Sequence, residues 1–167
     1  MPATRADLTR YLDSLGIRVS TVDHQPVFTV EEAQALRGTI AGAHSKNLFL
    51  KDKKGALFLV VTGEDAVIDL KRLHNRIGAS GRLSFGQPEL LLQTLGVTPG
   101  SVTPFGLIND RPPTARVILD ARLMAAEMLN FHPLVNTATT SLASDDLLIF
   151  IRATGHEPEI VNLTPGD

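Results

Sequence analysis

Residues 47–62 read NLFLKDKKGALFLVVT, and this stretch decides the fold. Apolar runs at 47–51 and 56–62 flank a polar turn around Lys53-Lys54-Gly55, which is the pattern of two neighbouring strands. The second run has apolar residues at consecutive positions instead of alternating ones, so both of its faces should be covered by other elements. The sequence therefore predicts a strand pair inside a layered protein.

Helical and strand patterns continue on both sides of this pair. Thr4 and Asp7 have the spacing of a helix N-cap and its acidic partner, and Gly16 ends that helix. Thr29 and Glu32 repeat the spacing ahead of a short, weakly apolar helix that should be loosely held. The other predicted elements are helices over Glu64–Ile77, Glu89–Leu95 and from Ser144 to Gly155, and strands over Ile17–Thr21, Arg116–Asp120, Thr137–Leu142 and Glu159–Leu163.

The order of these elements indicates the fold class. Strands and helices are interspersed, and some strands follow one another as hairpins. This order predicts a mixed α/β (α+β) protein with a mixed, largely antiparallel sheet flanked by helices, instead of a doubly wound parallel sheet. The chain has 167 residues and 18.0 kDa, the size of one ordinary domain. We therefore expect residues 1–167 to form a single compact domain.

The composition excludes several classes of protein. Hydrophobic residues make up 43% of the chain and charged residues 20%, which is a globular profile and not a disordered one. Because the chain has no cysteine, disulfides, thiolate nucleophiles and zinc–cysteine sites are excluded. The sequence shows no signal peptide and no apolar run long enough to span a membrane. We expect a cytoplasmic protein that does not bind membranes.

Basic residues are concentrated in one part of the chain. The net charge is −2, yet residues 37–86 hold nine Lys and Arg against four Asp and Glu. This segment is expected to form a face that meets phosphate, and an uneven solvated surface is the alternative. The candidate residues for this face are Lys51, Lys53, Lys54, Lys71, Arg72 and Arg76.

Common catalytic signatures are missing from the sequence. It contains no phosphate-binding Walker loop, no dinucleotide-binding glycine pattern and no Gly-x-Ser-x-Gly nucleophile elbow. No histidine lies three to five residues from another, so we expect no metal site and no cofactor. His24, His74 and His156 are interpreted as surface or packed residues.

Two stretches are harder to explain as scaffold. Residues 44–48, HSKNL, place Lys46 and Asn47 at the start of an apolar strand, where a lysine either reaches solvent or meets an anion. Residues 99–107, PGSVTPFGL, form a stiff loop whose backbone is open to close approach, although a plain connector is the alternative. Both stretches are candidates for ligand contact.

With a third stretch, residues 131–140 (FHPLVNTATT), they resemble a known family. The motifs are Lys46-Asn47-Leu48, Gly100-x-x-x-Pro104 and Phe131-His132-Pro133-Leu134. Their order and separation resemble the free-standing prolyl-tRNA editing proteins of the YbaK/ProX superfamily, which are similar to the editing domain inserted in bacterial prolyl-tRNA synthetases. The resemblance runs from about Leu8 to Leu163 and implies the fold of that superfamily.

The resemblance implies hydrolysis of the ester that joins a wrong amino acid to the 3′ adenosine of tRNA(Pro). Lys46 would bind the phosphate of that adenosine, and Asn47 would add a hydrogen bond nearby. Backbone groups of Gly100 would orient the aminoacyl group and water, and a side chain there would fill the ester's space and require a disfavoured backbone angle. His132 would line the aminoacyl pocket, with general base as the alternative role. The same loop offers three further substrate-binding candidates: Ser101, Thr103 and Pro104.

The resemblance also implies partners and a substrate. The string Thr103-Pro104-Phe105-Gly106-Leu107, followed by Asn109-Asp110, is similar to the alanine-specific group, so alanyl-tRNA(Pro) is the expected substrate. Cysteinyl-tRNA(Pro), a broader set of small aminoacyl groups, and a non-catalytic tRNA-end binding module of the same fold remain alternatives. The expected partner is the acceptor end of tRNA(Pro), with help from the basic residues or from prolyl-tRNA synthetase or an elongation factor. DNA binding is not expected.

Overall fold

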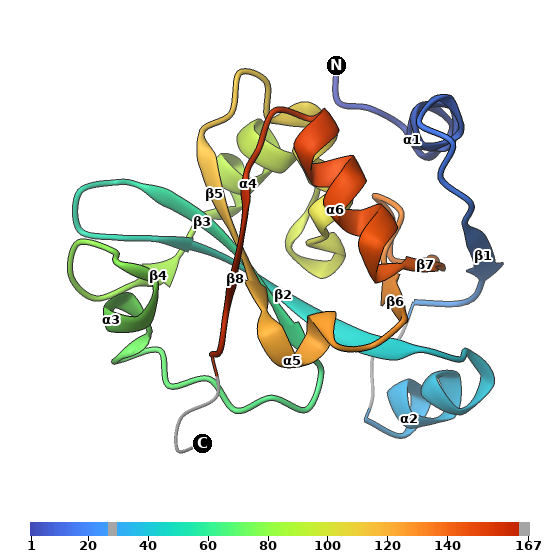
Figure 1. The fold of residues 1–167 in the computed structure, drawn as a ribbon, viewed down its shortest axis with the longest axis horizontal. Coiled ribbons are helices and arrows are strands. Elements are labelled where there is room, and N and C mark those ends of the chain that lie inside the picture. Colours follow the sequence, from blue (N-terminus) through green and yellow to red (C-terminus); the bar gives the residue numbers. More distant parts are fainter. Residues whose placement is uncertain (27–29, 164–167) are drawn as a thin grey trace.

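The structure is a computed structural model, and its description covers residues 1–26 and 30–163. An eight-stranded sheet runs through the molecule in the order β1-β7-β6-β2-β3-β5-β8, with β4 paired to β2 (Figure 1). Among the described strands, four pairings are antiparallel and three are parallel. The prediction of a mixed α/β fold with a mixed sheet is therefore confirmed.

The predicted strand pair lies at the centre of this sheet. Strand β2 (Ala43–Lys51) pairs antiparallel with β3 (Leu57–Gly63), from Ser45 opposite Gly63 to Lys51 opposite Leu57. Strand β3 is parallel to β5 (Ala115–Asp120), which is parallel to β8 (Pro158–Val161). Val60 and Val61 on β3 are both fully buried although they face opposite ways, which confirms that both faces of this strand are covered.

The two faces of the sheet carry different helices. The larger core is formed with α1 (Arg5–Ser14), α4 (Pro88–Leu95) and α6 (Ser144–Ala153), together with the 3-10 helix η2 (Pro104–Asn109). A second 3-10 helix, η1 (Pro99–Ser101), lies between α4 and η2 in the chain. The smaller core lies on the opposite face, under α3 (Leu73–Ile77). Thr4 caps α1 as predicted, because its hydroxyl accepts from Asp7 N while the Asp7 carboxylate accepts from Thr4 N.

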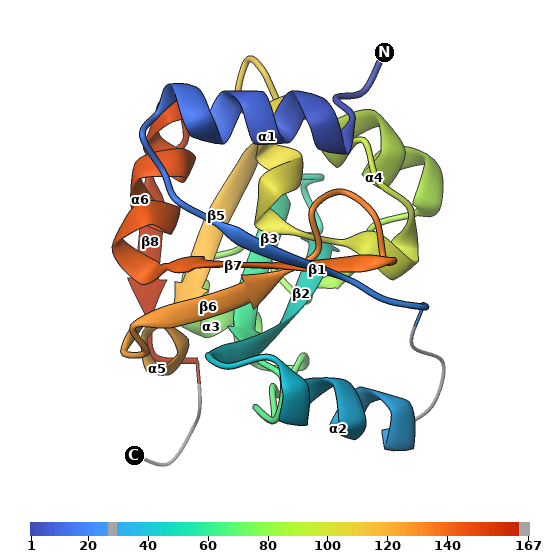
Figure 2. The same ribbon diagram turned by 90° about the vertical axis from the view of Figure 1, so that its right-hand side faces the viewer.

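The remaining elements lie at one end of the sheet. Strands β1 (Ser20–Asp23), β7 (Ala138–Ala143) and β6 (Met128–Phe131) pair antiparallel and cross the direction of β3 and β5 (Figure 2). Helix α2 (Val30–Thr39) lies below this part of the sheet in that view. The expected cap at Thr29 lies outside the described residues. Two short elements complete the fold, β4 (Ser84–Phe85) and α5 (Ala121–Met124).

The prediction of a helix over Glu64–Ile77 is wrong for most of its length. Only Leu73–Ile77 is helical, and residues 64–72 form irregular structure with two turns that leaves Val67 80% exposed. The Asp69 carboxylate accepts from Lys71 N at 3.1 Å, while Arg72 N donates to the Asp69 carbonyl, also at 3.1 Å. Aspartate side chains that bond nearby backbone in this way compete with helix formation. The first strand also begins later than predicted, because Ile17 is buried in the larger core ahead of β1.

Candidate active site

The candidate site begins where the sheet pairing along β2 is interrupted. On one edge, β2 pairs with β6 only at Ala43 and His44, and with β4 only at Leu50 and Lys51. Among the described strands, residues 45–49 therefore have no ladder partner on that edge. Ser45 Oγ donates to the carbonyl of Asn130 at 2.9 Å, which keeps β6 beside β2 at the point where the two strands separate.

Lys46 lies on this interrupted part of β2. Its side chain is half-buried and shares a sheet face with Leu48 and Leu50, because side chains alternate along a strand. The Lys46 ammonium donates to the carbonyl of Ala66 at 2.6 Å, which is its one polar contact with the described residues. The carbonyl fixes the direction of the ammonium but leaves its charge uncompensated. An anion that reaches this point would therefore meet an oriented cation.

Asn47 projects to the opposite face of the sheet. Its Nδ2 lies 3.4 Å from Ser45 Oγ, and its Oδ1 is buried without a hydrogen-bond partner. Asn47 therefore does not sit beside the Lys46 ammonium, as the sequence reasoning assumed. A buried acceptor without a partner costs free energy, and it is a position where a donor from a ligand would fit.

His132 follows the end of β6, in the loop that leads to β7. Its ring is half-buried, and Nδ1 lies 3.2 Å from the carbonyl of Ala138. Burial lowers the pKa of His132 below its usual value, the Ala138 carbonyl opposes that shift, and nearby His24 adds to it. The ring is therefore neutral at neutral pH, with Nδ1–H donating to Ala138 and Nε2 left as an acceptor.

The glycine-rich loop faces the loop that contains His132. A Cβ atom on Gly100 would lie 3.4 Å from Asn136 Nδ2, which is an ordinary contact distance. The φ angle of Gly100 is outside the left-handed region, so the expectation of a disfavoured backbone angle is wrong. Because Gly100 has no side chain, its backbone lies next to Asn136 without a Cβ between them.

The other three candidates of this loop are enclosed. Ser101 and Pro104 are buried, and Thr103 is fully buried with its hydroxyl accepting from Phe105 N. These residues shape the loop in the structure, and their side chains are not presented on its surface.

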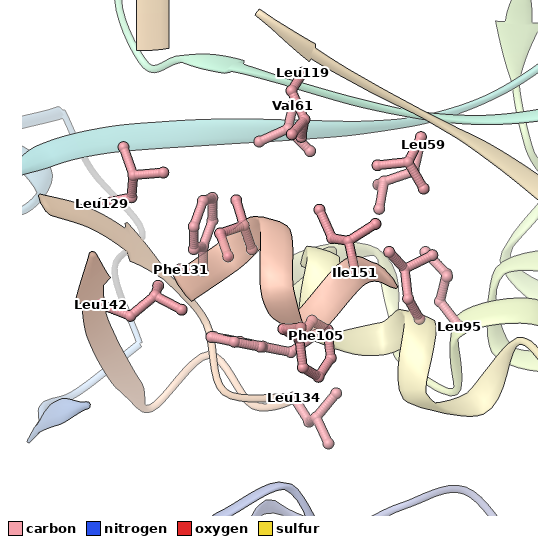
Figure 3. Close-up of a cluster of buried hydrophobic side chains, with 14 of the residues drawn as sticks. Leu59, Val61, Leu95, Phe105, Leu119, Leu129, Phe131, Leu134, Leu142 and Ile151 are labelled. Atoms are coloured by element: carbon pink, nitrogen blue, oxygen red, sulfur yellow. The ribbon is translucent and has the colours of Figure 1, made fainter. Parts of the chain in front are cut away.

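A common core anchors both loops. Phe105 of η2 packs edge-on against Phe131 at the end of β6, with ring centroids 6.0 Å apart (Figure 3). Leu134, in the middle of the His132 loop, also belongs to this core and has a φ of +71°, an unusual backbone angle for leucine. The position of Gly100 relative to Asn136 is thus set by buried aromatic packing. No contact among the described residues joins Lys46 directly to Gly100 or His132.

Sequence reasoning missed Asn136. Its side chain is half-buried, lies beside Gly100, and makes no hydrogen bond with the part of the chain that the structure describes. The one signal available was its place in the same motif segment as His132, residues 131–140. Its contact with a loop 36 residues earlier in the chain depends on tertiary packing, which a sequence pattern does not reveal.

The basic residues lie on another part of the molecule. They occupy the β2–β3 turn and the surroundings of α3, both at the left of Figure 1. Two of them have protein partners: Arg72 lies 3.8 Å from Asp69, and Arg76 donates to the carbonyl of Asn162 at 3.1 Å. The half-buried member is Lys51, and the exposed ones are Lys53, Lys54, Lys71, Arg72 and Arg76.

The described residues lack the features of a membrane-spanning helix and of a metal site. Within residues 1–26 and 30–163, no helix combines the length and apolar character needed to cross a bilayer. Over the same ranges, no three side chains of the His, Cys, Asp and Glu types gather at one point where they could hold a metal ion.

Comparison with known proteins agrees with this geometry. The family model of the aminoacyl-tRNA editing domain matches residues 24–150. The Mus musculus protein named "Prolyl-tRNA synthetase associated domain-containing protein 1" is 41% identical over 162 residues, covering 95% of this chain and 95% of its own length. The "Prolyl-tRNA editing protein ProX" of Acetoanaerobium sticklandii is 36% identical over 164 residues, covering 98% and 99%.

The fold is also found among solved structures. One, described as a candidate trans-editing enzyme for prolyl-tRNA synthetase, has a TM-score of 0.70 at 21% identity, covering 96% of this chain and 98% of that one. The family match spans most of the chain and includes the interrupted strand, the glycine-rich loop and the His132 loop. The chain therefore belongs to the aminoacyl-tRNA editing domain family, as its three motifs indicated.

Proposed function

We propose that this protein is a trans-acting deacylase that hydrolyses the aminoacyl ester of mischarged tRNA(Pro), with alanyl-tRNA(Pro) as its substrate. The observation that carries the proposal is the approach of two motif segments that lie far apart in the sequence. A Cβ atom on Gly100 would lie 3.4 Å from the amide of Asn136, in the loop that also holds His132, so the two segments lie side by side. The Asn136 amide has hydrogen-bonding capacity that the described residues do not use, as a group that binds an ester requires.

Lys46 binds the phosphate of the terminal adenosine in this proposal. Its ammonium is oriented by the Ala66 carbonyl at 2.6 Å, and no carboxylate among the described residues neutralises it. A compact, oriented cation suits a single phosphate oxygen. The unpaired Oδ1 of Asn47 accepts a hydrogen bond from the bound end on the other side of the strand.

The ester is held between Gly100 and the His132 loop. Water adds to the carbonyl carbon, the bond from that carbon to the ribose oxygen breaks, and the ribose oxygen takes up the proton. The vicinal ribose hydroxyl of the substrate helps to position and activate the water. Because aminoacyl esters are already activated, positioning supplies several kcal/mol of the barrier reduction without a strong nucleophile.

His132 forms the wall of the aminoacyl pocket. Its Nδ1–H is occupied by the Ala138 carbonyl, so the ring is held in place and presents Nε2 and its carbon edge. A wall of this kind excludes proline and larger groups by size. One methyl or hydroxyl group is worth only about 1–3 kcal/mol, so serine and glycine esters should be hydrolysed to some extent.

The tRNA(Pro) acceptor end is the partner, and the exposed basic residues around α3 and the β2–β3 turn contribute contacts to its phosphates. Five exposed residues and the half-buried Lys51 belong to this face. If they bind phosphate, tRNA affinity falls steeply as salt rises, and reversing the charge of Lys53 and Lys54 weakens binding to all tRNA species. A flat salt dependence would contradict this part of the proposal.

The deciding experiment incubates the protein with alanyl-, cysteinyl-, seryl- and prolyl-tRNA(Pro) and follows release of the amino acid. Rapid release of alanine, slower release of serine and stable prolyl-tRNA(Pro) are expected. Preferred release of cysteine would change the substrate assignment but keep the deacylase. Binding of every species without hydrolysis of any would show a tRNA-end binding module instead.

A further inference from the structure

A cavity that the proposed reaction does not use adjoins Lys46. It has a volume of about 530 Å³ and is lined by the start of β2, the turn after β3 and the end of β5 with α5. Ala66, whose carbonyl receives the Lys46 ammonium, is one of its walls. The lining residues are Ala43, His44, Gly63, Glu64, Asp65, Ala66, Val67, Asp120, Arg122 and Leu123.

The charge of the lining disfavours a phosphate inside the cavity. Glu64, Asp65 and Asp120 contribute carboxylates, and the lining has one guanidinium, that of Arg122. Asp120 is buried, and its carboxylate accepts from the Thr62 hydroxyl at 2.5 Å, so it forms part of a fixed acidic floor. A phosphate would be repelled here, whereas a neutral ring that carries amino groups would be attracted.

His44 supplies an acceptor of defined orientation. Its Nε2 lies 3.0 Å from the carbonyl of Ile40, and a carbonyl can only accept. Nε2 of the neutral ring therefore carries the proton, and Nδ1 retains its lone pair. A ligand amino group can donate to that nitrogen.

The remaining walls are apolar or lack a side chain. Leu123 is buried in the wall, while Val67 is 80% exposed although it is an apolar side chain on the cavity lining. Gly63 adds no side chain. A flat ring placed in the cavity would cover Val67 and remove it from water.

We propose that this cavity binds the base of the penultimate nucleotide of tRNA, a cytosine, with its amino group donating to His44 Nδ1. The inference rests on the proposed function: the phosphate assigned to Lys46 joins the terminal adenosine to the penultimate nucleotide. The adenosine side of that phosphate leads to the ester at Gly100, so the other side leads to the cavity wall at Ala66. Unstacked bases at single-stranded RNA ends are read through such edge contacts.

The test compares alanyl-tRNA(Pro) with the same tRNA carrying uridine at the penultimate position, where a carbonyl replaces the amino group. For the unmodified protein, kcat/KM should fall about tenfold with uridine, the size of one lost base contact. His44→Phe, which keeps a ring but removes the acceptor, should hydrolyse both substrates equally. Uridine at the third nucleotide from the end serves as the substrate control and should give no dependence on His44.

A second variant keeps the test valid if His44→Phe does not fold. Val67→Ala should raise KM several-fold for both substrates with kcat unchanged. Ile149 is an exposed apolar residue on α6 outside the cavity, so Ile149→Ala should leave KM unchanged. Equal kcat/KM of the unmodified protein for the cytidine and uridine substrates, or a Val67→Ala variant that behaves like Ile149→Ala, would overturn the inference.

A binding measurement distinguishes failure of this inference from failure of the proposed function. Affinity for uncharged tRNA(Pro) with penultimate cytidine or uridine can be measured without any hydrolysis. Tighter binding of the cytidine form, lost in His44→Phe, would support the cavity as a base-binding site even if no aminoacyl ester is cleaved. Equal affinity for the two forms would refute it in that case.

Discussion

Two histidine-containing regions of this molecule differ in how completely their polar groups are bonded. His156 is buried, with Nε2 2.8 Å from Asp110 Oδ2 and Nδ1 2.8 Å from the Thr154 hydroxyl. Asp110 also accepts from Thr114 and from Ala115 N. In the His132 loop, by contrast, the Asn136 amide has no partner among the described residues, and neither does Asn47 Oδ1 on β2.

The difference separates a structural network from a binding site. A fully bonded buried network can accept no further ligand, and it stabilises the fold by joining η2 to the segment after α6. Unused donors and acceptors lower stability slightly, but they leave positions that a substrate can fill. Substitutions in the first region should therefore change stability, and substitutions in the second should change activity.

The largest effect is expected from Asp110→Ala. The change leaves the buried His156 ring and the buried Ala115 amide without their acceptor, and exposed Thr114 loses its partner too. The free energy of unfolding should fall by about 3 kcal/mol. Urea unfolding measures it, with Asp145→Ala on the exposed first turn of α6 as the control. Deacylation by the folded fraction should be unchanged, and a specific loss of activity at full stability would break the comparison.

Lys46→Ala should have the opposite signature. Deacylation should fall at least about a hundredfold, because without its phosphate anchor the ester is no longer held in position, while the unfolding midpoint stays the same. Lys46→Arg should restore little, because a planar guanidinium does not replace a compact ammonium held by the Ala66 carbonyl. Arg18→Ala, which removes an exposed cation outside the proposed tRNA face, is the matched control. Near-native hydrolysis by Lys46→Ala would contradict the assignment.

The contribution of Asp110 to stability should depend on pH. Its hydrogen bonds from His156, Thr114 and Ala115 outweigh the effect of burial and lower its pKa from 3.8 to about 2. The resulting stabilisation is complete above pH 3.8 and is lost as the pH falls through about 2, and it amounts to about 2 kcal/mol. The stability difference between the unmodified protein and Asp110→Asn should shrink by that amount between pH 5 and pH 2. A difference that stays constant would contradict the lowered pKa.

The sequence predicted the regular parts of the fold because the relevant signals are local. The Thr4–Asp7 cap and the 47–62 strand pair depend on neighbouring residues, and both are confirmed. Strand β6 was missed because Asn130 interrupts its apolar pattern. The Asn130 amide is bonded to the carbonyls of Ala41 and Ala43 and to Ser141, partners that only the folded chain provides.

The site was predictable only in part, for the same reason. The three motifs indicated the family, but the contact of Gly100 with Asn136 comes from packing between Phe105 and Phe131. The cavity beside Lys46 depends on the turn that replaces the predicted helix after β3. Neither feature has a local sequence pattern, since each joins segments that are distant along the chain.

Substitutions of Gly100 test whether the site requires a residue without a side chain at this position. A Cβ at this position would lie 3.4 Å from Asn136 Nδ2, so Gly100→Ala should fold normally and lose activity only a few-fold. The larger side chain of Gly100→Val would enter the ester's space, and deacylation should fall roughly tenfold to a hundredfold with tRNA affinity little changed. Parallel loss of activity, tRNA affinity and melting temperature would instead identify a structural glycine.

The smallest and most specific change is expected from His132→Ala. The ring is held by the Ala138 carbonyl and forms the pocket wall in the proposed function, so removing it should loosen the pocket. Alanine release should fall about tenfold, because the small substrate is no longer held in position, while release of larger aminoacyl groups should rise relative to alanine. The measurement is the rate for each member of an aminoacyl-tRNA(Pro) panel with both proteins, across pH 5 to 8.

A general-base role for His132 would give a different pH profile. Because burial lowers the pKa of His132, the rate of the unmodified protein would then decrease only at pH values below the ordinary pKa range of histidine. Equal loss for every substrate, together with disappearance of that pH dependence, would make His132 an acid–base group. An unchanged panel would place His132 outside the site.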